Sequence, residues 1–274
     1  MAQENLEDQG FLDIEKVIAS KSEKLLRWLP PFVIGYLKKI IHQDKLNQFI
    51  ERNKHLHGLD FVAAIIEQFG IIVGYEGLEN IDPEKRYIIA ANHPLGGMDG
   101  IALMHVAGKI RKDILFPVND ILMNIPNLKE LFVPINKHGS NMENARIIDR
   151  AFESEVMMLF FPAGLVSRRQ KKGILDLEWK KTFIRKAKTY HRDIVPTYIS
   201  GRNSNWFYGL ANWRKRLGIG ANLEMLYLVD EMVKQKGKKI IIKFGKPIPY
   251  QNFNSHQSDL KWAEEVRDIV YQQK

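Results

Sequence analysis

RYIIAANHPLGGMDGIALMHVAGKI, residues 86–110, carries the signals that decide the fold. After Arg86, the run YIIAA is apolar and rich in β-forming side chains, so it predicts a strand, and the run from residue 100 onward predicts a helix. Between them lies the loop ANHPLGGMDG (91–100), with one histidine, two adjacent glycines and one aspartate. A strand that passes through a short loop into a helix is the repeating unit of α/β proteins.

The rest of the chain repeats this unit after residue 85. Six short β-rich runs alternate with helical segments: RYIIAA, ILFPV, LFVPI, EVMMLFF, DIVPTYI and KKIIIKF. These runs are almost continuously apolar, which is typical of strands covered by helices on both faces. The first 80 residues read as helices instead, interrupted at Pro30-Pro31. We therefore expect an N-terminal helical region over 1–80 and an α/β catalytic domain over 81–274.

Composition narrows the classes of function. With 274 residues, of which 45% are hydrophobic, the chain can bury a sizeable core. Its 41 Lys and Arg exceed its 32 Asp and Glu, giving a formal charge of +9 that favours an acidic partner such as nucleic acid, anionic lipid or a phosphorylated substrate. The absence of cysteine excludes disulfides, thiolate metal sites and cysteine nucleophiles. No cluster has metal-ligand spacing, so neither a metal nor another cofactor is expected.

Membrane contact is expected at the surface rather than through a spanning helix. The N-terminus MAQENLEDQG is polar and acidic, so no signal peptide is expected, and no segment reaches the roughly 20 uncharged apolar residues that cross a bilayer. Two segments suit an interfacial position, WLPPFVIGYLKK (28–39) and RNSNWFYGLANWRKRL (202–217), because aromatic side chains stand next to cations. Both also suit packing on the protein itself, and the second suits bases stacked beside a phosphate-binding groove.

His93 and Asp99 form a candidate catalytic pair in the loop. An imidazole titrates near pH 6.5, and a carboxylate beside it fixes its tautomer and stabilises the imidazolium that forms. Such a general base contributes about 10² to 10⁴ in rate. The loop follows a strand and opens a helix, which places it at the sheet edge where α/β proteins keep their sites, and N–H groups of Gly96 and Gly97 could face an oxyanion. Taken alone, the same residues fit a turn in which Asp99 caps the next helix.

A second candidate block, LFFPAGLVSRRQKK (159–172), runs from an apolar strand into cations. A strand end that presents a hydroxyl and two arginines suits a phosphate or carboxylate, although a solvated basic loop has the same composition. Lys137 ends the strand LFVPINK and could face the same cleft. The candidate substrate-binding residues are Gly96, Gly97, Lys137, Gly164, Ser167, Arg168 and Arg169.

In their order, these blocks resemble those of the glycerolipid acyltransferases, the lysophosphatidic acid acyltransferase-like family. The matching blocks are Asn92-His93 through Asp99, LFVPINK, FPAGLVSRR (161–169) and IVPTYISG (194–201), with KFGKPIPY (243–250) closing the domain. The resemblance covers about residues 70–250. It implies a mixed, mostly parallel central sheet flanked by helices, and acyl transfer from an acyl carrier protein or coenzyme A thioester to a lysolipid hydroxyl. It also implies that His93 is the general base and Asp99 its orienting partner.

The sequence departs from the family pattern at three places, one in the His93 block and two in the blocks that bind the acceptor. PLGGM places five residues between His93 and Asp99 where the family commonly has four, and Lys137 and Ala163 stand where it carries an arginine and a glutamate that help hold glycerol phosphate. The pattern is similar to a hemolysin-like bacterial subgroup that acylates lyso-ornithine or lyso-glycine lipids. We therefore expect a peripheral enzyme on the cytoplasmic face of the inner membrane, with an anionic membrane surface and no nucleic acid as partner. A 1-acylglycerol-3-phosphate acyltransferase and a non-enzymatic, hemolysin-like membrane binder remain the alternatives.

Overall fold

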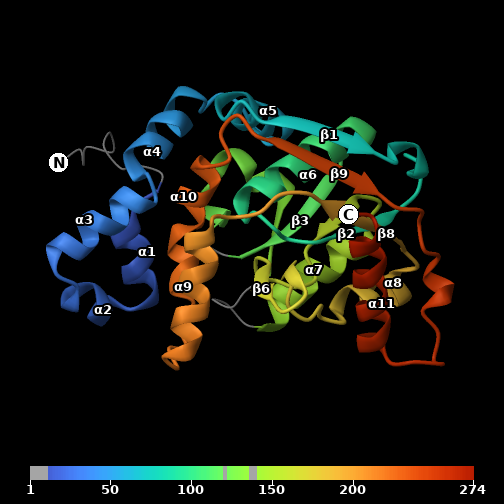
Figure 1. Ribbon diagram of the computed structural model, residues 1–274. Helices are drawn as coiled ribbons and strands as arrows, with labels where there is room; N and C mark the ends of the chain where they lie inside the picture. Colours follow the sequence, from blue (N-terminus) through green and yellow to red (C-terminus); the bar gives the residue numbers. More distant parts are fainter. Residues whose placement is uncertain (1–11, 120–121, 136–140) are drawn as a thin grey trace.

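The computed structural model describes residues 12–119, 122–135 and 141–274 (Figure 1). Its α-helices are α1 (Ile14–Lys21), α2 (Glu23–Trp28), α3 (Pro31–Ile40), α4 (Gln43–Arg52), α5 (Gly58–Gln68), α6 (Gly97–Ile110), α7 (Asn141–Glu153), α8 (Thr182–Tyr190), α9 (Asn205–Arg216), α10 (Leu228–Val233) and α11 (Asp259–Gln272). Its strands are β1 (Ile72–Glu76), β2 (Tyr87–Ala91), β3 (Ile114–Val118), β4 (Phe132–Pro134), β5 (Met157–Phe160), β6 (Arg168–Gln170), β7 (Gly173–Leu175), β8 (Asp193–Ile199) and β9 (Lys239–Phe244). Short 3₁₀ turns include η1 (Leu78–Asn80), η2 (Leu122–Asn124), η3 (Pro126–Leu131), η4 (Leu223–Tyr227) and η5 (Tyr250–Asn252).

Seven strands form one central sheet in the order β1-β9-β8-β2-β5-β3-β4. Every neighbouring pair is parallel except β8 and β9, which run antiparallel. The sheet is therefore mixed and mostly parallel, with helices on both sides, which confirms the fold class expected from the sequence. The remaining strands, β6 and β7, form a separate two-stranded hairpin.

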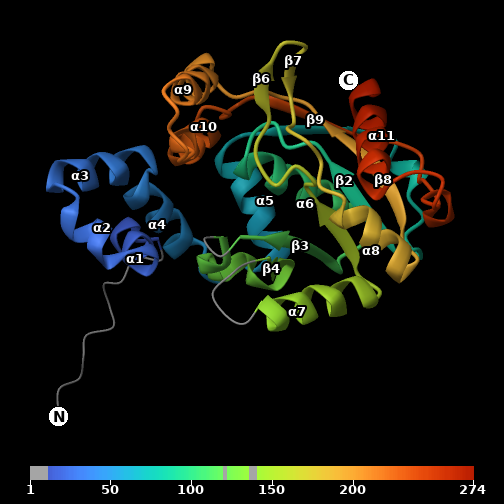
Figure 2. The same ribbon diagram turned by 90° about the horizontal axis from the view of Figure 1, so that it is seen from below.

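Helices cover both faces of the sheet, and the central strand β2 shows the division. Ile89 and Ala91 of β2 belong to the core cluster that includes residues of α5 and α6, whereas Ile88 and Ala90 belong to the cluster that includes residues of α7, α8 and α11. All five residues of β2 are buried. This two-sided burial explains why the strands read as continuous apolar runs rather than alternating ones. Figure 2 shows the sheet between these two sets of helices.

The topology brings three blocks of the chain to one edge of the sheet. β2 is parallel to both of its neighbours, β5 and β8, so the carboxyl ends of the three strands point the same way. The segments that follow these strands, 92–96, 161–167 and 200–204, therefore start side by side. Asn92 joins two of them directly, since its Nδ2 donates to the Ile199 carbonyl at 2.9 Å and its Oδ1 accepts from the Ile199 N–H at 2.6 Å.

The N-terminal segment is helical, as expected, but not all of it lies outside the sheet. β1 is the edge strand paired with β9, and α5 packs in the same core cluster as α6. Helices α1–α4 precede these elements, and α1 and α3 share a small cluster of their own around Ile14, Leu37 and Ile40. Figure 1 shows α1–α3 beside α9 and α10, at the side of the α/β layers. The division at residues 80 and 81 stays a prediction.

Candidate active site

His93 and Asp99 face each other across the loop between β2 and α6. His93 Nδ1 lies 3.1 Å from both carboxylate oxygens of Asp99. Because a carboxylate only accepts hydrogen bonds, Nδ1 carries the proton and donates it. Within the described part of the chain no group bonds the other ring nitrogen, Nε2, which leaves it able to take a proton from a substrate.

Asp99 is also part of the start of α6. The helix begins at Gly97, so Asp99 is its third residue, and its Oδ2 accepts from the backbone N–H groups of Leu95 at 2.8 Å and Gly96 at 3.3 Å. The side chain is fully buried. Asp99 thus closes the loop onto the helix, as the N3 acid of a capping box does, and holds His93 with the same carboxylate. The two interpretations of Asp99 from the sequence, helix cap and catalytic partner, describe one geometry.

The glycines of the loop are needed for its shape. Gly96 has φ +83°, a conformation that favours glycine, and a Cβ there would lie 3.0 Å from a methyl group of Leu228. Its N–H is directed at Asp99, so it is not free to face an oxyanion as the sequence suggested. Gly97 is exposed and is the first residue of α6, where backbone N–H groups lack intrahelical acceptors.

The imidazole of His93 is held in a partly buried, aromatic setting. Its side chain is 17% exposed and stacks on the ring of Phe161, with centroids 4.2 Å apart and planes inclined by 23°. Burial lowers the pKa of His93, but the charge and hydrogen bond of Asp99 outweigh it, with a further contribution from Asp176, so the pKa lies above its ordinary value. Phe161 begins the FPAG block, which therefore reaches the candidate catalytic pair through a ring contact.

Asp176 ties the His93 loop to the FPAG block. This carboxylate is 1% exposed, and its Oδ1 accepts from the His93 backbone N–H at 3.2 Å and from Ser167 Oγ at 2.5 Å. Its Oδ2 accepts from Trp179 Nε1 at 2.8 Å. Burial raises the pKa of Asp176 against the opposing effect of these donors. Asp176 was not predicted from the sequence, because an Asp and a Trp three positions apart, as in LDLEW, cannot be told from an ordinary turn.

Ser167 lies within this network and not at a free surface. Its N–H donates to the His93 carbonyl at 2.7 Å, and the residue is 2% exposed. Gly164 has φ +64°, and a Cβ there would lie 3.4 Å from Nζ of Lys180. The structure thus brings Ser167 to His93 itself, and Gly164 to a cation that the sequence analysis did not single out.

The two arginines that follow Ser167 occupy different environments. Arg168 is 3% exposed, and its guanidinium donates to Glu224 at 2.8 Å and to the Val166 carbonyl at 2.6 Å. Arg214 binds the same glutamate at 2.8 Å, so Arg168 belongs to a buried ion cluster between β6, η4 and α9. Arg169 is exposed on the hairpin and donates to Asn205 at 2.7 Å. Of the two, only Arg169 presents its charge at the surface, while Lys137 lies outside the described residues.

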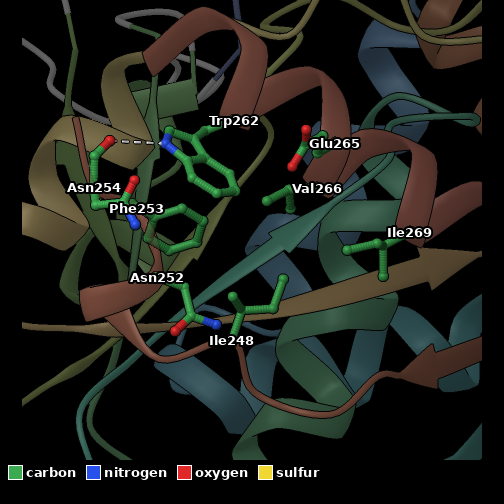
Figure 3. Close-up of a pocket in the computed structure, with 8 residues that line it drawn as sticks. All are labelled: Ile248, Asn252, Phe253, Asn254, Trp262, Glu265, Val266 and Ile269. Carbon is green, nitrogen blue, oxygen red and sulfur yellow. Dashed lines mark hydrogen bonds between the residues drawn. The ribbon is translucent and has the colours of Figure 1, made fainter. Parts of the chain in front are cut away.

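One apolar cavity lies apart from this pair. It has a volume of about 460 Å³ and opens between η5 and α11 (Figure 3), where Phe253, Trp262 and Val266 contribute to its wall. The Trp262 indole N–H donates to the Asn254 carbonyl at 3.1 Å at its rim. None of the residues that line it belongs to the loop 92–99 or to the block 161–169.

Comparison with known proteins identifies the family. The model of a family described as "Acyltransferase" matches residues 16–274. The chain belongs to this acyltransferase family. It is similar to a lyso-glycine lipid O-acyltransferase of Bacteroides thetaiotaomicron, 46% identical over 268 residues that cover 97% of this chain and 98% of that protein. It is also similar to a lyso-glycine lipid O-acyltransferase of Phocaeicola vulgatus, 45% identical over 268 residues that cover 97% and 96%.

A solved structure shares the fold of this acyltransferase. The 1-acyl-sn-glycerophosphate acyltransferase PlsC from Thermotoga maritima superposes with a TM-score of 0.50 over 86% of this chain and 79% of that one, at 19% sequence identity. The resemblance inferred from the four sequence blocks is thus confirmed at the level of family and fold. Among the helices of the described residues, none is long and apolar enough to cross a bilayer.

Proposed function

We propose that this acyltransferase moves an acyl chain from a thioester to the hydroxyl of a lysolipid, with His93 as the general base. The observation that supports this role most directly is the contact of His93 Nδ1 with both oxygens of Asp99, which leaves Nε2 without a partner in the described chain. A neutral imidazole held in this tautomer can accept a hydroxyl proton at Nε2, and the buried carboxylate stabilises the imidazolium that results.

The reaction then follows from proton and electron balance. The lysolipid hydroxyl oxygen bonds to the thioester carbonyl carbon while its proton passes to Nε2 of His93. The negative charge on the carbonyl oxygen is stabilised by the positive N-terminal end of α6, where the N–H of Gly97 is the glycine donor that Asp99 does not use. Collapse of this intermediate breaks the carbon–sulfur bond, and the imidazolium returns the proton to the leaving thiolate. Acyl carrier protein and coenzyme A both supply such a thiol, and no further cofactor is required.

We propose a lyso-aminolipid as the acceptor, with a glycine headgroup first and an ornithine headgroup second. Two similar proteins named lyso-glycine lipid O-acyltransferase, aligned over 97% of this chain, support this choice. Ala163, which stands where glycerol phosphate acyltransferases carry a glutamate, is 5% exposed and packs in the core cluster beneath the sheet. A buried methyl group offers no polar contact to a glycerol phosphate, so we place 1-acylglycerol-3-phosphate behind the aminolipids.

A membrane-facing surface would bring the enzyme to its lipid. Trp28 and Phe32, at α2 and α3, are 82% and 77% exposed, and Trp206 on α9 is 58% exposed. The two regions adjoin, because the hydroxyl groups of Tyr36 and Tyr227 are 2.7 Å apart and the Trp206 ring meets the Tyr227 ring edge-on. Exposed aromatic rings at two neighbouring places suit a headgroup layer, and we propose peripheral binding at the cytoplasmic face of the inner membrane.

The test combines purified protein, an acyl thioester and three lysolipids with glycine, ornithine and glycerol phosphate headgroups. We expect transfer to the glycine lipid, and a fall of about 10²- to 10⁴-fold in kcat for His93→Ala, since removing the general base removes its contribution. His55→Ala, which changes an exposed histidine near the end of α4, is the matched control. Wild-type rates in the His93→Ala protein would contradict the mechanism, and preferred transfer to the glycerol phosphate lipid would contradict the acceptor.

A further inference from the structure

Two arginines from separate blocks of the chain meet on one neutral side chain. Nη2 of Arg169, in β6, donates to Oδ1 of Asn205 at 2.7 Å, and Nη2 of Arg202 donates to the same oxygen at 2.5 Å. The Nη2 atoms of Arg169 and Arg202 bond the same oxygen, so the distance between them cannot exceed the sum of the two hydrogen-bond lengths. Like charges this close repel each other, so an arrangement that gathers them is suited to an anion.

No carboxylate neutralises this pair within the described residues. Glu231 contacts Ser204, the residue before Asn205: it accepts from the backbone N–H of Ser204 at 2.5 Å and from its Oγ at 2.6 Å. Lys234 also donates to Glu231, at 2.8 Å. The hydrogen bonds that Glu231 accepts therefore come from Ser204 and Lys234, not from the guanidinium groups. Arg169 and Arg202 together keep their double positive charge.

The surroundings of the pair are ordered and leave the guanidinium edges accessible. The guanidinium carbon of Arg169 lies 5.6 Å from the ring centroid of Tyr208, whose side chain is fully buried and whose hydroxyl accepts from the Asn203 N–H at 3.0 Å. Asn205 is the first residue of α9, so the positive end of that helix adds to the field. An arginine stacked by its face on an aromatic ring presents its donor edge for a bidentate carboxylate or phosphate.

The pair also flanks the His93 loop on two sides. Arg169 is two residues beyond Ser167, which hydrogen-bonds the His93 carbonyl, and two extended residues span at most about 7 Å. Arg202 follows Gly201, whose Cα packs so closely on the loop that a Cβ would lie 2.9 Å from a methyl group of Leu95. Each arginine therefore follows, by one or two residues, a residue that contacts the His93 loop, so an anionic group bound by the pair would lie near that loop.

We propose that Arg169, Arg202 and Asn205 form the binding site for the carboxylate of the acceptor headgroup. A glycine attached through its nitrogen presents a free carboxylate, which two arginines can bind by charge-assisted hydrogen bonds. This inference rests on the proposed function and adds the residues that select the headgroup. Arg168 takes no part, because its guanidinium is buried against Glu224. The other anion that the site could take is a phosphate of the acyl donor.

The test measures Arg169→Gln and Arg202→Gln with two acceptors, the glycine-headed lysolipid and its methyl ester. We expect the preference for the free carboxylate over the ester to fall by about 10- to 100-fold in each variant, which corresponds to the loss of a charge-assisted hydrogen bond. The KM for the acyl donor stays within about twofold. Arg185→Gln, on the exposed surface of α8, is the control and keeps the wild-type preference.

Two outcomes would overturn the proposal: an equal loss on both acceptors, or a rise confined to the donor KM, which would assign the arginines to the donor phosphate. A direct binding measurement separates this proposal from the proposed function. Titration of the glycine-headed lysolipid and of its ester into catalytically inactive His93→Ala protein reports headgroup recognition without turnover. If wild-type protein acylated no lysolipid, the proposed function would fail, and this titration would still decide the arginine site by whether Arg202→Gln weakens the acid selectively.

Discussion

Replacing Asp176 by asparagine tests whether the carboxylate beneath the catalytic loop sets both the position and the charge state of His93. An asparagine keeps one acceptor oxygen of the same shape but places an NH₂ group on the other side. It can therefore serve either His93 and Ser167 or Trp179, but not all three donors that now converge on Asp176. One hydrogen bond to a charged acceptor is worth about 1.5–3 kcal/mol. Removing the buried charge offsets part of this loss, since burial already opposes ionisation of Asp176.

The expected free energy of unfolding falls by about 1–3 kcal/mol, equivalent to a Tm lower by about 2–10 °C for a chain of this size. A shift of the His93 backbone by a fraction of an ångström is expected to lower kcat by about 10- to 100-fold. Asp176 is one of the charges that raise the pKa of His93. The base works as neutral imidazole, so losing that charge lowers its pKa and moves the acid limb of the kcat/KM profile to lower pH.

The assay is the pH profile of kcat/KM, with thermal unfolding measured on the same samples. Asp193→Asn is the control, because Asp193 accepts a backbone N–H from Tyr250 at 3.0 Å away from the catalytic loop. That variant is expected to lose stability without moving the acid limb. The reasoning fails if the normalised profile of Asp176→Asn superimposes on that of the wild type, since Asp176 would then be a stabilising residue with no effect on the base.

Three further changes test other contacts of the site. Gly201→Ala forces a Cβ to 2.9 Å from Leu95 at φ +123°, so we expect a loss of about 1–3 kcal/mol in chemical denaturation together with reduced activity. Phe161→Leu removes the ring that stacks on His93; a loss of about 0.5–1.5 kcal/mol of stacking predicts a several-fold lower kcat with KM little changed, and an unaltered kcat would show that the stacking is irrelevant. Glu224→Gln leaves two buried arginines without their counter-charge and is expected to cost about 3–5 kcal/mol of stability, measured by urea unfolding.

The sequence was sufficient to predict most of the sheet. All six apolar runs proposed as strands contain strands. Burial on both faces leaves a continuous apolar pattern, as in β2, whereas β9 alternates between buried and partly exposed residues. β1 was not predicted, since IVGYE follows directly on the apolar helix α5 and Gly70, with φ +55° at the turn between them, was not recognised as the end of that helix. β6 carries two arginines, β7 is only three residues long, and the two strands pair only with each other, so no longer apolar run marks them.

The site residues likewise fall into those that the local sequence predicts and those that depend on tertiary contacts. His93 and Asp99 were predictable because they lie only six residues apart in the chain, and their contact needs only local chain geometry. Asp176, 83 residues beyond His93 in the chain, reaches the loop through tertiary packing, and periodicity gives no information about such a contact. Arg168 was predicted to bind substrate but is buried against Glu224, and the sequence did not indicate this because the glutamate lies 56 residues away. Adjacent residues in a strand point to opposite sides, so Arg168 and Arg169 could not both face the same ligand.

The double use of Asp99 links the folding of this enzyme to its chemistry. The carboxylate that satisfies the N–H groups of Leu95 and Gly96 at the start of α6 is the one that holds His93. Formation of this end of α6 therefore also orients the imidazole of His93, the proposed base. Loss of the Asp99 side chain would therefore affect both the start of α6 and the orientation of His93, whereas loss of the His93 side chain would leave the cap of α6 in place. A degenerate relative that has lost activity should then keep this aspartate longer than the histidine beside it.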